Sequence, residues 1–262
     1  MTKRNAISLL VAAGLTASCS TVADKTVESE PKRVLNAQEM EERATAIQAM
    51  QEMSAHLRSL QKFSVHADVS FDEVLDNGQK VLLNKAVEIK VERPSKLWAK
   101  VATEYSQREF YFDGNNFTIY TPDLGYFASF SAPATLGDVV KKAKNDYDIE
   151  VPIADLFLWG TKEDASGDVE EAIIVGIDRV NGVSCNHFAF REKEIDWQIC
   201  IQRDGVPLPL KLVITEKGDV TQPQHISVLT WNTAPDLSDQ NYTFTAKKGD
   251  QKIAFRKVKT DK

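Results

Sequence analysis

The chain has 262 residues, of which 42% are hydrophobic, so it can bury a sizeable core. Its 32 lysines and arginines stand against 38 aspartates and glutamates, which gives a formal net charge of −6. This balance argues against a nucleic-acid partner, because affinity for the phosphate backbone depends on clustered positive charge.

The chain begins with a segment that predicts export. Lys3 and Arg4 precede an apolar run at residues 6–15, and a basic start followed by a short apolar run is typical of a signal peptide. The run is far shorter than the roughly 20 apolar residues of a membrane-spanning helix. Leu-Thr-Ala-Ser-Cys at residues 15–19 then resembles a lipobox, the motif whose cysteine is acylated in bacterial lipoproteins.

We therefore expect residues 1–18 to be a signal peptide and Cys19 to be a lipidation site. The mature protein then lies in the periplasm and is held to the membrane by an N-terminal lipid anchor. Ser20 is not aspartate, which favours the outer membrane over retention in the inner membrane. Thr16 stands where a lipobox usually has leucine. The alternative is ordinary secretory cleavage near Ser18, which leaves a soluble periplasmic protein.

A polar segment follows the cysteine. Residues 20–32 are polar and charged, contain Pro31 and show no apolar periodicity. Such a composition is typical of a flexible linker. We therefore expect residues 19–35 to be a lipidated cysteine with its tether, and residues 36–262 to form a single domain.

The domain opens with a predicted amphipathic helix. Asn36 and Glu39 have the spacing of a capping box. Apolar residues at intervals of three and four then predict a helix of about 25 residues; they are Met40, Ala44, Ile47, Met50, Met53, Leu57 and Leu60. We expect this helix to cover a face or a mouth of a sheet. The alternative is a surface helix that docks on a membrane or a partner.

After the helix the apolar period changes to two, which predicts strands. In the first half the alternating segments are residues 63–71, 81–91, 97–101, 110–112, 117–120 and 126–130. Turn-forming residues separate them, including Asp76-Asn77-Gly78, in which Asn-Gly tolerates positive φ. Sequential short strands with tight turns favour an antiparallel meander that curls toward a sandwich or barrel.

A helical insert interrupts the meander, and strands then resume. Thr135 and Asp138 cap a predicted helix that extends to Tyr147, and residues 152–159 predict a second short helix that plugs the sheet or forms a lid. The later strands are predicted at residues 172–180, 183–190, 195–201, 207–215, 225–231, 242–246 and 253–258. We expect about eleven strands in a mainly β, α+β fold with largely antiparallel pairing.

The two downstream cysteines can be placed by strand register. A hairpin of residues 183–190 and 195–201 with its tip at Glu192 and Lys193 sets Phe188 opposite Trp197. The same register sets Cys185 opposite Cys200 on the other face. Directly opposed residues can be close enough to bond, and an oxidising periplasm permits it. A Cys185–Cys200 disulfide is one expectation, and two buried free thiols are the other.

Motifs for catalysis are absent from the sequence. The four histidines, His56, His66, His187 and His225, have no metal-ligand spacing, and no H-E-x-x-H, G-x-S-x-G or glycine-rich phosphate loop occurs. Cys185 and His187 share a strand face, but nothing supplies an oxyanion hole or an orienting carboxylate. We therefore expect no enzyme, no cofactor and no metal site.

Several blocks of the sequence resemble a known family. They are Arg93-Pro94, residues 110–114, residues 180–187 and, most specifically, Asp196-Trp197-Gln198 followed by residues 205–214. Over about residues 40–258 the chain resembles a family of predicted periplasmic bacterial proteins of unknown function. That family is similar in fold to the lipoprotein carriers LolA and LolB. Cys200 stands where the family has an aromatic residue, so the resemblance does not extend to the disulfide.

The resemblance implies a strongly curved antiparallel sheet, an incomplete barrel, closed by helices over an apolar cavity. The residues expected to line that cavity are Phe63, Val65, Val69, Phe71, Val87, Ile89, Phe110, Phe112, Phe117, Ile119, Phe188 and Trp197. The leading hypothesis is a non-enzymatic envelope lipoprotein that binds a lipid, a lipoprotein acyl chain or another apolar ligand. The alternative is a structural or interaction module that docks an envelope protein through a sheet edge or its lid.

Overall fold

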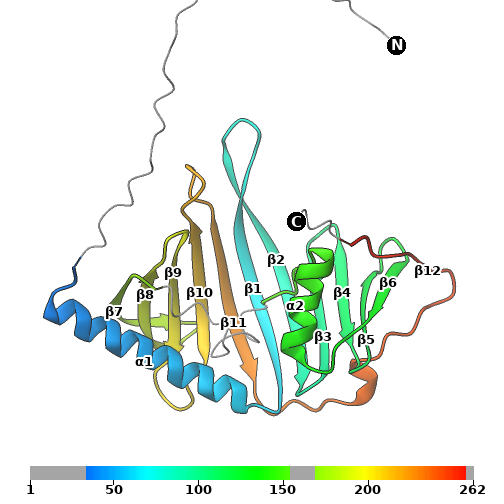
Figure 1. Ribbon diagram of the computed structural model, residues 1–262, viewed down its shortest axis with the longest axis horizontal. Helices are drawn as coiled ribbons and strands as arrows, with labels where there is room; N and C mark the ends of the chain where they lie inside the picture. Colours follow the sequence, from blue (N-terminus) through cyan, green and yellow to red (C-terminus); the bar gives the residue numbers. More distant parts are fainter. Residues whose placement is uncertain (1–33, 154–168, 258–262) are drawn as a thin grey trace, which may run out of the picture. The chain divides into compact units, whose positions relative to one another are not determined.

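A computed structural model describes residues 34–153 and 169–257 of the chain. Residues Leu35–Lys262 form one compact unit, built on a single sheet of twelve strands in the order β12-β6-β5-β4-β3-β2-β1-β11-β10-β9-β8-β7 (Figure 1). Eleven of these strands pair antiparallel, and β12 alone is joined in parallel to β6. Since β7 and β12 are the two ends of the order, the curved sheet is not closed. The predicted mainly β fold is confirmed.

The elements follow one another in the order that the periodicity predicts. The helices are α1 (Ala37–Ser59) and α2 (Leu136–Tyr147), with a 3-10 turn, η2, at Asp239–Asn241. The strands before α2 are β1 (Lys62–Val74), β2 (Lys80–Glu92), β3 (Lys96–Ala102), β4 (Gln107–Phe112), β5 (Asn116–Thr121) and β6 (Tyr126–Ser131). Those after it are β7 (Glu171–Val180), β8 (Val183–Arg191), β9 (Ile195–Gln202), β10 (Pro209–Glu216), β11 (Gln224–Asn232) and β12 (Gln251–Lys252).

One face of the sheet, here called the inner face, carries the core. On β1 the inward residues Phe63, Val65 and Val69 are buried. All three pair with residues of β2, and Val65 and Val69 also pair with residues of β11. Both helices pack on this face, because Met53 of α1 and Val139 of α2 belong to the same buried cluster as these strand residues. The side chains alternate with a period of two along each strand, so one register fixes the inner face across the whole sheet.

Helix α1 begins where the capping box predicts. The Asn36 side chain accepts from the Glu39 backbone N–H at 3.0 Å, and the Glu39 carboxylate accepts from the Asn36 N–H at 2.8 Å. The apolar stripe is only partly buried, because Met50, Met53 and Leu57 lie in the core and Met40 is exposed. The predicted stripe therefore packs into the core only in the later turns of α1.

Two strands expected near the C-terminus are wrong. Residues 242–246 are irregular instead of a strand, because the Phe244 ring packs on the outer face of the sheet against Tyr111, Tyr120 and Phe127. The strand expected at 253–258 is also absent there. The pairing lies just before that range, where the two-residue β12 pairs with β6. The expected helix at 152–159 falls largely outside the described residues.

The β8–β9 hairpin differs from the predicted register by two residues. Arg191 pairs with Asp196, and the Glu192 N–H donates to the Ile195 carbonyl at 2.9 Å, so the two-residue tip is Lys193-Glu194 instead of the expected Glu192-Lys193. Phe190, instead of Phe188, therefore lies opposite Trp197. A shift of two keeps every side chain on its predicted face.

The same shift changes how the cysteines meet. Cys185 pairs with Gln202, and Cys200 pairs with His187, so the two cysteines are diagonal neighbours. They form a disulfide with their Cα atoms 5.4 Å apart. Both are buried on the outer face beside Val180 and Leu210.

Candidate ligand-binding pocket

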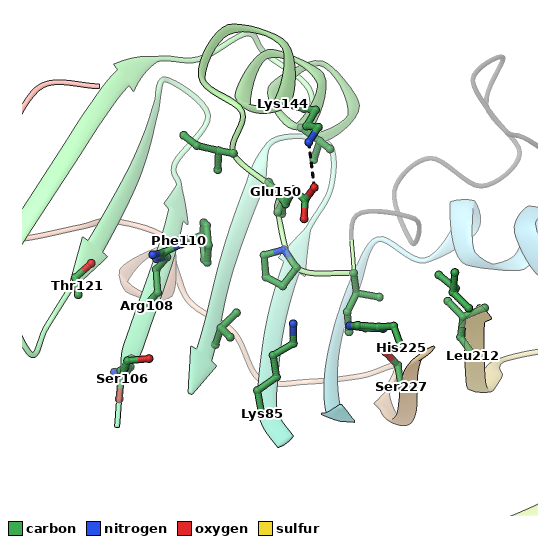
Figure 2. A pocket seen from close by; sticks show the side chains of 18 of the residues that line it. Lys85, Ser106, Arg108, Phe110, Thr121, Lys144, Glu150, Leu212, His225 and Ser227 are labelled. Carbon is green, nitrogen blue, oxygen red and sulfur yellow. Dashed lines mark hydrogen bonds and ion pairs between the residues drawn. The ribbon is translucent and has the colours of Figure 1, made fainter. Parts of the chain in front are cut away.

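A pocket of about 760 Å³ lies between the inner face of the sheet and the helix α2 (Figure 2). Strands β2, β3, β4, β5, β10 and β11 supply one wall. The facing wall is the polar side of α2 with the segment 149–153 that follows it. The pocket thus lies at the point where residues far apart in the sequence meet over one sheet face.

Part of the pocket wall is apolar. Phe110, Val140, Val151 and Leu212 are buried residues that line it, and Val101 contributes a half-buried side chain. These residues also belong to the main core or pack against it. The apolar wall is therefore continuous with the core of the domain.

The remaining described wall is polar and carries more basic than acidic side chains. Among the described residues, four cationic side chains line the pocket, Lys85, Arg108, Lys141 and Lys144, and Glu150 is the one carboxylate. Lys144 pairs with that carboxylate at 3.0 Å (Figure 2) and with Asp148 at 2.8 Å. The described lining residues thus carry more positive than negative side chains, although the whole chain is negative.

Lys85 occupies an inward position on β2, opposite Val69 of β1. Its Nζ lies 4.8 Å from the centroid of the Phe71 ring, and on β11 the His225 ring stacks on Phe71 at 6.5 Å. Burial lowers the pKa of Lys85, and the Glu150 carboxylate partly opposes that shift. Burial, with a smaller effect of Lys85, also lowers the pKa of His225.

Most of the residues predicted to line a cavity lie in the buried core. Ten of the twelve belong to the buried core cluster, and Ile119 packs against it. Of the set, Phe110 lines the pocket described above, and Phe71 lies beside it, half-buried under Lys85. The polar residues of the pocket were not predicted. One signal for them is present in the sequence, because Lys85 interrupts the inward row that Val87, Ile89 and Val91 define.

The remaining sequence expectations concern chemistry. Among the residues described, no three or more His, Cys, Asp or Glu side chains form a group that could hold a metal ion. The Nε2 atom of His187 lies 3.1 Å from the Oε1 atom of Gln198 on the outer face. Cys185 is held in the disulfide, which removes the free thiol that a Cys–His pair needs.

No helix in the described ranges is long and apolar enough to cross a membrane. Cys19 lies outside these ranges.

The fold and pocket define a class of protein, an open curved sheet covered by helices with a pocket beneath one of them. The chain belongs to the family of predicted periplasmic proteins (DUF2092), whose profile matches residues 46–256. This confirms the family that the sequence blocks predict. No curated protein matches the chain.

The solved structures to which the chain is similar include two mycobacterial proteins, one of them the lipoprotein LppX. LppX of Mycobacterium tuberculosis is 14% identical with a TM-score of 0.46, and the match covers 74% of this chain and 99% of LppX. LprF of Mycobacterium bovis is 14% identical with a TM-score of 0.43, over 74% of this chain and 95% of LprF. A LolA superfamily protein of Nitrosomonas europaea is 7% identical with a TM-score of 0.35, over 76% and 97%. These likenesses concern the fold and say nothing about ligands.

Proposed function

We propose that this protein is a non-enzymatic lipoprotein of the cell envelope that binds a lipid, a lipoprotein acyl chain or another apolar ligand. The observation that carries the proposal is the pocket between the inner face and α2, with its volume of about 760 Å³. Ligand sites commonly occupy about 300 to 1,000 Å³ and combine an apolar wall with a few placed polar groups. The pocket has both features, with Phe110 and Val140 in the apolar wall and Lys85 at its polar side.

The pocket is tested by filling it. We expect Val101→Trp to weaken ligand binding at least tenfold, because Val101 lines the pocket and is only half-buried. Ala102→Trp is the matched control, since Ala102 is the next residue of β3 and side chains alternate between faces. Native mass spectrometry and lipid extraction of the full chain carrying Cys19→Ala avoid detergent in the pocket. If no lipid copurifies and no acyl ligand binds the parent chain, the proposal is wrong.

The site of action is proposed to be the periplasmic side of the outer membrane. The family description supports the periplasm, and the lipobox-like residues 15–19 support an anchor at Cys19. Cys19→Ala should move the protein from the membrane fraction to the soluble fraction. An unchanged distribution in fractionated cells would reject acyl anchoring.

An interaction module is the second candidate, and one observation favours it. Strand β7 is an end of the strand order, and Ile173, Val175 and Ile177 on it are more than half exposed. An exposed apolar edge strand can pair with a strand of another chain. If the pocket stays empty in cells while Ile177→Lys abolishes cross-linking to one envelope protein, this second candidate replaces the first.

A further inference from the structure

We propose that the ligand is an anionic amphiphile, whose phosphate or carboxylate head contacts Lys85 while its chain lies along the apolar wall of the pocket. This inference rests on the proposed function and adds the charge of the ligand to it. Three observations carry it: the position of Lys85 on the inner face, its lack of an acceptor, and the charge balance of the pocket wall.

The position of Lys85 marks where the inner face changes character. Along β2 the inward residues Val91, Ile89 and Val87 are buried, and the next inward position is Lys85. Ser227 of β11 occupies a neighbouring inward position, since it pairs with Val69, which in turn pairs with Lys85. Apolar wall and polar groups thus meet within one pocket, which suits a ligand with an apolar chain and a polar head.

Lys85 lacks the carboxylate partner that several other strand lysines have. Lys62, Lys80 and Lys100 each pair with a carboxylate at 3.1 to 3.4 Å. Lys85 has no hydrogen bond or ion pair with any residue that the structure describes. Its ammonium instead lies over the face of the Phe71 ring. A half-buried ammonium without an acceptor is unfavourable, and an oxyanion can supply a charge-assisted hydrogen bond there.

In the described part of the pocket wall, the Glu150 carboxylate does not cancel the positive charge of the lysines and the arginine. Glu150 pairs with Lys144, which leaves Lys85 and Arg108 without an ion pair in the described part of the chain. Figure 2 shows the Lys85 side chain rising from β2 toward the segment that carries Glu150, so its ammonium faces the pocket space. Cations that line a concave site attract an anionic ligand and disfavour a cationic one.

The test compares ligands with one 12-carbon chain and different heads. The full chain carrying Cys19→Ala is titrated by calorimetry, below the micelle concentration, with dodecyl phosphate, dodecyl maltoside, dodecyltrimethylammonium and inorganic phosphate. We expect dodecyl phosphate to bind at least tenfold more tightly than the maltoside. Lys85→Gln should weaken dodecyl phosphate about tenfold, the effect of losing one hydrogen bond to a charged group. The same variant should leave the maltoside unchanged.

Lys90→Gln is the matched control. Lys90 lies on the same strand with opposite parity, and its Nζ is also over an aromatic ring, 4.7 Å from the centroid of Trp98. It should leave both affinities unchanged. If the maltoside binds as tightly as the phosphate and Lys85→Gln alters neither, the inference is overturned and the proposed function stands. If inorganic phosphate binds as tightly as dodecyl phosphate, the site is for a free anion and the inference fails. If none of the 12-carbon ligands binds, the proposed function falls with it.

Discussion

Replacing both disulfide cysteines by alanine should destabilise the domain by a predictable amount. Cys185 and Cys200 are 15 residues apart in sequence. In the chain-entropy account, a cross-link closing a loop of that size contributes about 3 kcal/mol, because it restricts the unfolded chain. For a domain of this size each kcal/mol moves the melting temperature by about 2 to 4 °C, so we expect a loss of about 6 to 12 °C.

The assay is thermal unfolding followed by circular dichroism, with Cys19→Ala as the common background. When the parent is unfolded and refolded with reductant, its melting temperature should fall by the same amount, about 6 to 12 °C. Without prior unfolding it should resist reductant, since the exposed fractions of Cys185 and Cys200 are 0% and 2%. A thiol count in denaturant should find no free thiol in the parent. If the double alanine variant melts within about 2 °C of the parent, the cross-link does not stabilise the domain and this reasoning is refuted.

Two further predictions concern stability. The Asp72 carboxylate accepts from the Gln224 N–H at 3.0 Å and from the Lys80 Nζ at 3.1 Å, and these bonds lower its pKa in that order. A pKa below the unfolded value of 3.8 gives stability that is present above that value and is lost as the pH falls through the folded value. Urea unfolding should therefore show that Asp72→Asn is more destabilising at pH 7 than at pH 2, and an equal loss at both would contradict the assignment. Phe112 is 0% exposed in the core, so Phe112→Ala should cost about 3 to 5 kcal/mol in the same assay. A cost under about 1 kcal/mol would show that the inner face is not the core.

Local signals in the sequence predict most of the fold. The alternation in residues 63–71 identifies both the strand β1 and its buried face. Asn181 and Gly182, which separate the strands predicted at residues 172–180 and 183–190, form a turn with positive φ, 48° and 83°, a conformation that these two residue types tolerate. Where a short stretch of chain decides its own structure, the sequence is sufficient.

Errors arise where a distant contact decides. Phe244 lies in a segment with the alternating pattern of a strand. Its ring instead packs against Tyr120 and Phe127 on the outer face of the sheet, and no strand forms there. The β8–β9 register depends on the position of a tight turn, and the strand pattern does not encode whether the tip is Glu192-Lys193 or Lys193-Glu194. The polar side of the pocket could not be predicted for the same reason. Its residues come from β2 and β11, which are separated by β1 in the sheet, and from α2, and these elements are far apart in the sequence.

Phe63 and Phe71 show why side-chain parity identifies a face but not a pocket. Both have inward parity on β1, and the sequence treats them alike as cavity residues. Phe63 is 1% exposed and packs against Trp231 in the core, whereas Phe71 is half-buried between Lys85 and His225. The strand β1 has 13 residues and pairs with β11 over only eight of them. The helices therefore need not fill the inner face along its whole length, and the placement of α2 decides which inward residues are core and which border the pocket. The charged residue that breaks an apolar inward row, Lys85, is the one sequence feature that distinguishes the two regions.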